Sequence, residues 1–256
     1  LFNKDFITIG SAFTVFQGIV TGNNPAFIFE NEDDALAHGV DTVLLHPLCH
    51  GRDIGRYEIK SRERRILYID NSIDIEDYPN TKKWLLDFKE QLSKRREAKK
   101  GVISWYGLQW PRVKSELDIK EKILIQRTRN EALKQRIIAT IDEEGVYGME
   151  GIYFIITKDE GVSLYFLLGI LNSKLMNYLF ATKFLNLAIK AEYLKQVMIP
   201  SASDKNIITL VKEILQTKRM NSGTDTSSLE HEIDQLVYQL YGLTDEEIAI
   251  VEGSNE

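Results

Sequence analysis

The sequence predicts an α+β fold, in which a mostly antiparallel β region with an inserted basic helix precedes a helical region. Short β-prone runs separated by Gly, Asn and Asp clusters fill the first seventy residues, and leucine and isoleucine recur at helical spacing in the last third. With 256 residues, 43% of them hydrophobic, the chain is long enough to bury a sizeable core. We expect a β-rich region at 1–160, a helical part of the same domain at 161–220, and a hinge with acidic helices at 221–256.

The N-terminal strands are expected where β-branched and aromatic residues stand between turn-forming residues. The expected runs lie at 6–9, 26–29, 43–45 and 65–69. The segment GNNP at 22–25 is expected to turn the chain between the first two runs, because these residue types favour tight turns.

A basic helix is expected after Tyr78 and Pro79. Thr81 can cap this helix, and Gly101 is expected to end it. Its apolar residues fall on one narrow stripe that can dock on a core, namely Trp84, Leu85, Phe88 and Leu92. The next segment, 102–112, is expected to form a loop that carries Trp105, Tyr106 and Trp110.

Strands and then helices are expected in the rest of the chain. The expected strands lie at 122–128, 136–141 and 151–157, and the helical stripes lie at 164–179, 207–214 and 229–240. Ser163 can cap the first of these helices. Thr244 and Glu247 have the spacing of a capping box, which predicts a final short helix. The composition of 221–228 predicts a flexible hinge.

Charge is strongly segregated along the chain, although its net value is −6. Residues 41–140 hold 22 Lys and Arg against 15 Asp and Glu, and the remainder holds 10 against 23. Between Lys82 and Lys100 there are eight basic and three acidic residues. If this stretch is helical, it presents a concentrated positive face, which is typical of nucleic-acid binding as well as of ordinary solvated surface.

The segment Asn24-Pro25-Ala26-Phe27 differs by one substitution from NPPF, the signature with which amino-methylating DNA methyltransferases hold the target base. Ala26 in place of the second proline removes part of the rigidity of such a loop. The enzyme also needs a strand, a glycine-rich turn and an acidic residue for its cofactor, and the short stretch before this segment contains no such unit. We therefore predict a structural turn and no catalytic residue.

Metal chemistry has weak support in the sequence. Glu58 and Lys60 have the Glu-x-Lys form of a metal-dependent nuclease, but the nearest upstream acid, Asp53, is only five residues away. The segment HPLCH at 46–50 offers three possible ligands, whereas a structural zinc site needs four. We predict no metal site, and a nuclease that uses Glu58 and Lys60 remains the alternative function.

Cysteine usage and hydropathy indicate the compartment. The single cysteine, Cys49, excludes an internal disulfide and fits a reducing cytoplasm. The longest apolar run, 164–171, has eight residues, whereas a membrane span needs about twenty. We expect a cytoplasmic protein without membrane contact. Because the chain starts at Leu1 without a signal-peptide pattern, we expect it to be a fragment of a longer protein.

Arginine dominates the segment HGRDIGRYEIKSRERR at 50–65. The planar guanidinium fork suits phosphates and the O6/N7 edge of guanine. The segment also contains Asp53, Glu58 and Glu63, which can pair with several of the arginines. Its arginines and its tyrosine are Arg52, Arg56, Tyr57, Arg62, Arg64 and Arg65.

Six motifs follow one another along nearly the whole chain. They are GIVTGN with AF at 18–27, LLHPLCHGRDIGRY at 44–57, YP with the basic segment and WY at 78–106, LLGILNSKL at 167–175, YL with IP at 193–200, and EIDQLVYQLYGL at 232–243. This order resembles the TaqI-like C-terminal target recognition (specificity) domain of adenine-N6 DNA methyltransferases and type IIG restriction-modification enzymes. The chain departs from the family pattern at His46 and His50, where Arg or Lys is common.

The resemblance implies that the chain recognises a short sequence in double-stranded DNA. A separate methyltransferase domain, N-terminal in the same parent protein, would transfer a methyl group from S-adenosylmethionine to adenine N6, so no cofactor is expected in this chain. Residues 1–160 would then form the recognition region. A scaffold that docks proteins through its acidic helices is a third possible function.

The expected DNA-binding residues are the cations and aromatic residues of the basic middle of the chain. They are Arg52, Arg56, Tyr57, Arg62, Arg64, Lys82, Lys83, Lys94, Arg95, Arg96, Lys99, Lys100, Trp105, Tyr106, Trp110, Arg112, Arg127 and Arg129. Phosphate contacts are expected from the lysines and arginines between Lys82 and Lys100, and base contacts from the loops.

Overall fold

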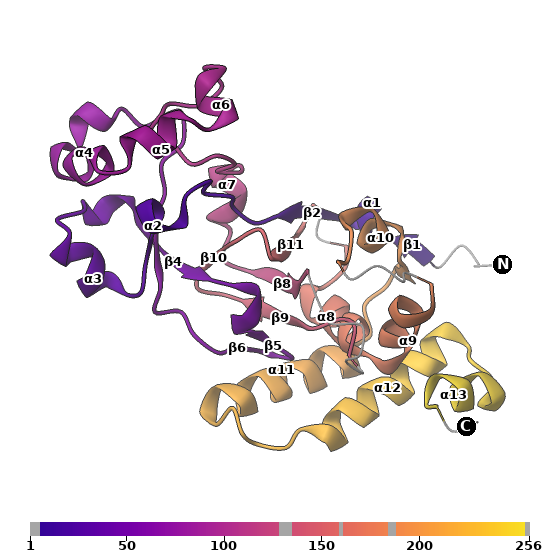
Figure 1. Ribbon diagram of the computed structural model, residues 1–256. Helices are drawn as coiled ribbons and strands as arrows, with labels where there is room; N and C mark the ends of the chain where they lie inside the picture. The colour runs from indigo at the N-terminus through magenta and orange to yellow at the C-terminus, as the bar shows by residue number, and fades with distance from the viewer. Residues whose placement is uncertain (1–5, 128–134, 159–160, 184–187, 254–256) are drawn as a thin grey trace.

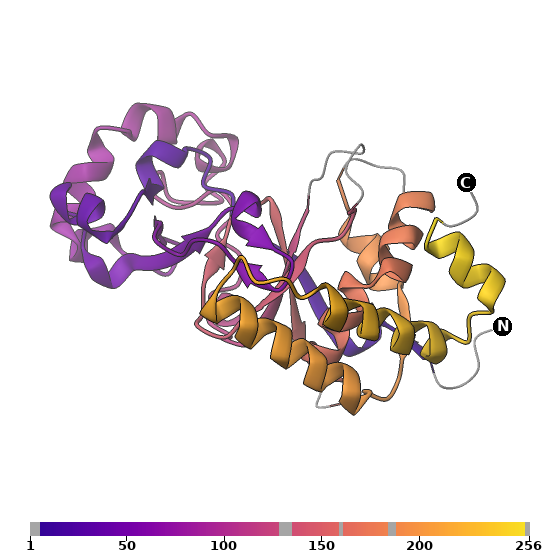
Figure 2. The ribbon, with the colours of Figure 1, turned by 90° about the horizontal axis from the view of Figure 1, so that it is seen from below.

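A computed structural model describes residues 6–127, 135–158, 161–183 and 188–253 (Figures 1 and 2). It confirms the α+β prediction, with most β-strands between residues 6 and 157 and mainly helices after them. In the described ranges no single helix is both long and apolar enough to cross a membrane, although α8 (Leu164–Asn172) and α9 (Lys174–Thr182) satisfy those criteria together as a pair bent by 60°.

An antiparallel sheet with strand order β2-β11-β8-β9 lies at the centre of the molecule. Both of its faces are covered, which explains why its strands are almost continuously apolar. Ile123 and Ile155 face one hydrophobic core, which includes α8, and Leu124 and Phe154 face the other. The strands are β2 (Phe13–Gln17), β8 (Lys122–Gln126), β9 (Ala139–Asp142) and β11 (Ile152–Thr157).

The second core belongs to an N-terminal lobe, which is drawn in indigo and purple at the left of Figure 1. Its sheet has the order β10-β4-β7-β3, in which β10 pairs with β4 in parallel and the other pairs are antiparallel. Its strands are β3 (Ile28–Phe29), β4 (Leu45–Cys49), β7 (Arg65–Leu67) and β10 (Tyr147–Gly148). Its helical elements are α2 (Asn24–Phe27), α3 (Glu32–Ala37), η1 (Thr42–Leu44), η3 (Ile75–Asp77), α4 (Pro79–Leu86), α5 (Lys89–Ser93), α6 (Arg96–Lys99) and α7 (Lys114–Leu117).

Short elements connect the lobe, the central sheet and the helices. β5 (Ile54–Gly55) and β6 (Glu58–Ile59) form a hairpin after η2 (Gly51–Asp53). β1 (Phe6–Thr8) pairs antiparallel with β12 (Met198–Pro200), and α1 (Ile9–Ala12) packs against α10 (Ala191–Gln196).

The prediction of a single basic helix between Tyr78 and Gly101 is wrong, because this segment forms the three short helices α4, α5 and α6. Thr81 does not cap it, since α4 already starts at Pro79 and the Thr81 hydroxyl donates to Asp41 across 2.6 Å. The last break falls at Arg95, which has an extended ψ of 140°. Gly101 ends the segment with a φ of +68°, as expected.

Two of the expected N-terminal strands are only partly correct. Residues 24–27 form the short helix α2 rather than a turn and the start of a strand, because Pro25 suits the first helical turn. The strand starts only at Ile28. Residues 42–44 form a 3-10 turn, and β4 follows from Leu45. β9 similarly starts at Ala139, three residues later than expected.

The C-terminal helices start at their expected local signals, but the stripe expected at 164–179 divides at Ser173 into α8 and α9. The Ser163 hydroxyl accepts a hydrogen bond from the Tyr165 N–H at 3.2 Å, and the capping box of Thr244 and Glu247 is present. α12 buries Ile233 and Val237 in the same core as the central sheet, and it lies along α11 in both views. These helices are α11 (Lys205–Met220), α12 (Ser227–Tyr241) and α13 (Asp245–Val251).

Candidate nucleic-acid interface

Segments that are far apart in the sequence meet at one end of the central sheet, where β2 and β8 end and β11 begins. We call this surface the recognition ridge. The ridge consists of Gln17, Arg52, Arg112, Gln126, Arg127 and Glu150, and contains three guanidinium groups, two carboxamides and one carboxylate.

Gly18 allows the end of β2 to lie close to the backbone that precedes β11. Its N–H donates to the carbonyl of Ile152 at 2.9 Å, and the next N–H, of Ile19, donates to Gly148 at 2.8 Å. A Cβ atom at Gly18 would lie 2.2 Å from the carbonyl oxygen of Met149, so no other residue fits without moving the backbone. Glycine at this position therefore brings Gln17 beside Glu150, whose carbonyl accepts from the Gln17 carboxamide at 2.8 Å.

The opposite side of the ridge depends on a second close backbone contact. A Cβ atom at Gly51 would lie 2.9 Å from the carbonyl oxygen of Gly151. The Gln126 carboxamide donates to the Gly51 carbonyl at 2.8 Å, and the Arg127 N–H donates to the Gly151 carbonyl at 2.9 Å. These bonds place Arg52 next to the end of β8.

Two polar atoms of the ridge are buried without a hydrogen-bond partner among the described residues. They are Nε of Arg127, a donor, and Oε2 of Glu150, an acceptor. Leaving such a group unpaired costs about 1–3 kcal/mol, more for charged groups, so a bound molecule that supplies partners gains affinity. Arg52 is exposed and forms no ion pair in the part of the chain that the structure describes.

The ridge carries net positive charge near neutral pH. Burial lowers the pKa of Arg112 from 12.5, and Glu150 and Tyr153 partly oppose that shift. A guanidinium nonetheless stays protonated near neutral pH. The Nε of Arg112 donates to the Gly18 carbonyl at 2.8 Å, which fixes the side chain on the ridge.

Four other predicted DNA-binding residues hold the protein together in this structure. Arg56 pairs with Glu230 on α12 and donates to the Asn172 carbonyl at 2.7 Å. Arg62 bonds Asp142 at 3.1 Å, Arg64 bonds Asp53 at 3.0 Å, and the Tyr57 side chain is 2% exposed. The contact of these four residues, Arg56, Tyr57, Arg62 and Arg64, with DNA stays a prediction.

The predicted phosphate-binding cations fall into two groups. Lys82 pairs with Glu76, Lys94 pairs with Glu90, and Arg95 donates only to backbone carbonyls. The other four are exposed and form no ion pair among the described residues, and we call them the lobe cations: Lys83, Arg96, Lys99 and Lys100. Arg129 lies outside the described residues.

The three aromatic residues predicted to contact DNA differ in their exposure to solvent. Trp105 and Tyr106 are half-buried against the lobe core, and the Tyr106 hydroxyl donates to the Ile73 carbonyl at 3.4 Å. Trp110 is 47% exposed and lies beside the ridge, because its backbone pairs with Val20.

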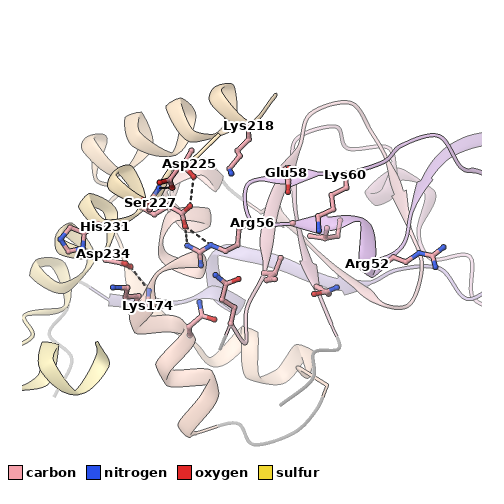
Figure 3. A pocket seen from close by; sticks show the side chains of 18 residues that line it. Arg52, Arg56, Glu58, Lys60, Lys174, Lys218, Asp225, Ser227, His231 and Asp234 are labelled. Atoms are coloured by element: carbon pink, nitrogen blue, oxygen red, sulfur yellow. Dashed lines mark hydrogen bonds and ion pairs between the residues drawn. The ribbon is translucent and has the colours of Figure 1, made fainter. Parts of the chain in front are cut away.

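A cavity of about 930 Å³ adjoins the ridge (Figure 3). Arg52 and Lys60 lie on one side of it, and α12 forms the other side with Glu230, His231 and Asp234. Its lining is of mixed charge. The cavity therefore separates the ridge from the acidic C-terminal helices.

The nuclease and metal interpretations gain no geometric support. Glu58 and Lys60 lie on the β5–β6 hairpin and line the cavity, whereas Asp53 is engaged by Arg64. The described residues contain no group of three or more His, Cys, Asp or Glu side chains that could hold a metal ion. Burial, followed by nearby Asp142, raises the pKa of the Cys49 thiol, which disfavours a thiolate ligand.

Acidification is expected to destabilise the fold through His46 and His50. Burial is the main cause that lowers the pKa of both from 6.5, with Lys114 adding to the effect at His46 and Arg64 at His50. The unfolded chain therefore takes up protons first, and the free energy of unfolding falls as the pH drops below about 6.5 until the folded histidines titrate. Urea unfolding from about pH 8 to about pH 5.5 measures this effect.

A His46→Phe variant provides the comparison, because phenylalanine can keep the stacking on Tyr147, where the ring centroids are 4.3 Å apart. Its stability should depend less on pH over this interval. Equal pH dependence in the variant and the natural chain would contradict the role of His46.

Sequence reasoning missed half of the ridge, namely Gln17, Gln126 and Glu150. Uncharged carboxamides and one isolated acid carry no signal in a single sequence. The glycines at positions 18, 51 and 151 were the only sequence signal near these residues. Their role depends on backbone contacts between distant segments, which the sequence does not reveal.

The chain is similar to a known family and to several known proteins. Residues 46–200 match the model of the family described as the TaqI-like C-terminal specificity domain. The chain is 24% identical over 248 residues to the type II methyltransferase M.BstVI of Geobacillus stearothermophilus, covering 93% of this chain and 41% of that protein. It is 25% identical over 248 residues to M.PaeR7I of Pseudomonas aeruginosa, with 93% and 40% covered.

A putative type II restriction enzyme and methyltransferase of Methanocaldococcus jannaschii, RM.MjaORFECS2P, is 31% identical over 134 residues, which cover 47% of this chain and 11% of that protein. The chain thus spans less than half the length of these relatives.

Two solved structures share the fold. The type IIL restriction-modification enzyme MmeI, solved with DNA, superimposes with a TM-score of 0.61 at 15% identity, covering 94% of this chain and 34% of that one. The type IIG restriction endonuclease BpuSI gives 0.51 at 15% identity, with 92% and 31% covered. The chain belongs to the family of TaqI-like C-terminal specificity domains, the DNA target recognition domains of restriction-modification enzymes.

Proposed function

We propose that this chain binds a short sequence in double-stranded DNA and presents it to a methyltransferase domain that is N-terminal in the same protein. That domain would transfer a methyl group from S-adenosylmethionine to adenine N6, and this chain would supply the specificity. The names of the type II methyltransferases to which the chain is similar support the reaction class. A restriction-modification enzyme acts on DNA inside the cell, which supports a cytoplasmic location.

The recognition ridge is the surface proposed to read base edges, and the observation that carries this proposal is its composition. Guanidinium groups pair with O6 and N7 of guanine, carboxamides pair with N6 and N7 of adenine, and a carboxylate accepts from the amino group of cytosine. The buried partnerless atoms of Arg127 and Glu150 support an external partner at this surface.

The lobe cations are proposed to bind phosphates beside the ridge. They lie on α4, α6 and the turn after α6, and their charges are not neutralised by ion pairs among the described residues. Phosphate contacts fix the register of the duplex and carry no sequence information, whereas the ridge supplies the sequence preference.

Binding measured against salt concentration tests the function. About five phosphate contacts predict a slope of log K against log salt of about −4 to −5, and a randomised duplex library should yield one enriched sequence. A slope near zero, or binding without an enriched sequence, would overturn the proposal. Incubation of plasmid with Mg²⁺ or Mn²⁺ gives the separate test of a nuclease, and cleavage by the purified chain would favour that alternative.

A further inference from the structure

Trp110 exposes a large apolar ring where the ridge meets the N-terminal lobe. Its side chain is 47% exposed, and Tyr178 on α9 is the other exposed Phe, Tyr or Trp ring among the described residues. An indole can bury up to about 250 Å² of surface in a contact, so its exposure leaves substantial hydrophobic free energy to be gained on binding.

The backbone under Trp110 is held in place. Its N–H donates to the Val20 carbonyl at 2.8 Å, and its carbonyl accepts from the Val20 N–H at 3.1 Å. Gln109 on the preceding side donates its N–H to the Thr21 carbonyl at 3.2 Å. A rigid aromatic side chain with two rotatable bonds loses little conformational entropy on binding.

Arg112, on the C-terminal side of Trp110, also holds this backbone in place. It has a φ of +69°, an unfavourable conformation for a residue with a Cβ, and two hydrogen bonds hold it there. Its Nε donates to the Gly18 carbonyl at 2.8 Å, and its carbonyl accepts from the Tyr68 hydroxyl at 3.3 Å. The backbone that carries Trp110 is therefore held in place on both sides, beside the ridge.

The surroundings of the ring favour a nucleic-acid base over an apolar protein surface. The neighbouring ridge residues Arg112, Gln17 and Glu150 are polar or charged, and burying them against an apolar partner would cost free energy. A base presents a flat π-face for stacking and polar edges for hydrogen bonds, so it suits both the ring and its neighbours.

We propose that Trp110 stacks on a base at the border of the sequence read by the ridge, and opens that base step. This inference rests on the proposed function. Aromatic wedges of this kind unstack one step and gain affinity that is largely independent of which base is contacted. Trp110 would thus contribute binding strength and DNA distortion, and the ridge would contribute the sequence preference.

The experiment places the fluorescent base 2-aminopurine at successive positions across and beside the selected sequence, because its emission rises when it is unstacked from its neighbours. We expect the natural chain to increase the emission at one border position. Trp110→Phe should retain the increase, and Trp110→Ala should lose it. Trp110→Ala should also bind about 5- to 100-fold more weakly, with the salt slope and the enriched sequence unchanged.

Tyr178→Ala removes the other exposed ring, on α9, and should match the natural chain in both measurements. Thermal unfolding of every variant shows that it is folded, and the emission scan of the natural chain tests the inference without any variant. Unchanged emission at every position, or Trp110→Ala binding within twofold of the natural chain, would overturn the inference. A salt-dependent and selective natural chain would still support the proposed function, whereas unselective binding would overturn that function itself.

Discussion

Replacing Arg52 and Arg127 together by alanine should weaken binding to the selected duplex at least about 30-fold, the largest functional effect expected from the ridge. Each guanidinium that contacts guanine bidentately contributes about 1–3 kcal/mol of discrimination. Both residues lie where the ends of β8 and η2 meet. Fluorescence anisotropy with labelled duplexes, at one fixed salt concentration, measures the dissociation constants of the selected and a scrambled sequence.

The matched control removes the same charge elsewhere. Lys195 and Lys205 are exposed on α10 and α11, and Lys195 lies beside Gly10, which belongs to α1 before β2 begins. The Lys195→Ala/Lys205→Ala variant should lose only the small, sequence-independent affinity due to net charge. Equal losses in the two double variants would show that the ridge arginines act through bulk charge, and would contradict specific base contacts.

Replacing Arg95 by methionine should lower the free energy of unfolding by about 2–4 kcal/mol, the largest effect on stability expected from one cation. The Arg95 guanidinium donates to the carbonyls of Thr21 at 2.9 Å and Trp105 at 2.8 Å, and to that of Leu92 at 3.0 Å. Burial lowers its pKa to about 10, so it remains a cation at neutral pH. Methionine keeps the packing but leaves these carbonyls without a donor.

Urea unfolding measures this change, and Arg96→Met is its control. Arg96 is adjacent, exposed and forms no ion pair among the described residues, so its replacement should change stability by no more than about 0.5 kcal/mol. Because Arg95 joins the 102–112 loop to Thr21, its loss should also loosen the support of Trp110 and weaken DNA binding. Equal stability of the two variants would contradict the structural role of Arg95.

Features of the fold that depend on neighbouring residues could be predicted from the sequence. Ser163 and the Thr244–Glu247 pair mark helix starts through side chains that bond to backbone within the next few residues. The apolar runs of β8 and β11 are equally local signals, because strands buried on both faces need nearly every residue to be apolar.

Features that depend on distant contacts could not be predicted. The basic segment breaks at Arg95 because its guanidinium is bonded to Thr21 and Trp105, which no helical periodicity reveals. Short helices such as α2 likewise depend on tertiary packing more than on propensity. Arg52, Arg112 and Arg127 were among the expected DNA-binding residues, but their proximity follows from the close backbone contacts of glycine at 18, 51 and 151.

Several arginines illustrate why composition alone does not define a DNA-binding surface. Arg56, Arg62 and Arg64 belong to the same basic segment as Arg52, yet they pair with acids that lie in α12, in β9 and in η2. Ion pairing of this kind reduces the charge available to phosphates. Arg52 is the arginine of the segment that is exposed and forms no ion pair in the described part of the chain.

The central claim is that the recognition ridge determines which DNA sequence the chain prefers. The most direct test compares the sequences enriched from one randomised duplex library by the natural chain and by Arg52→Ala, at the same salt concentration. Arg52 extends away from α12 at the edge of the cavity, so its removal leaves the other ridge contacts in place (Figure 3). The account predicts that the variant loses its preference at one or two adjacent positions and keeps it at the rest. An unchanged preference at every position, with only weaker binding overall, would contradict it.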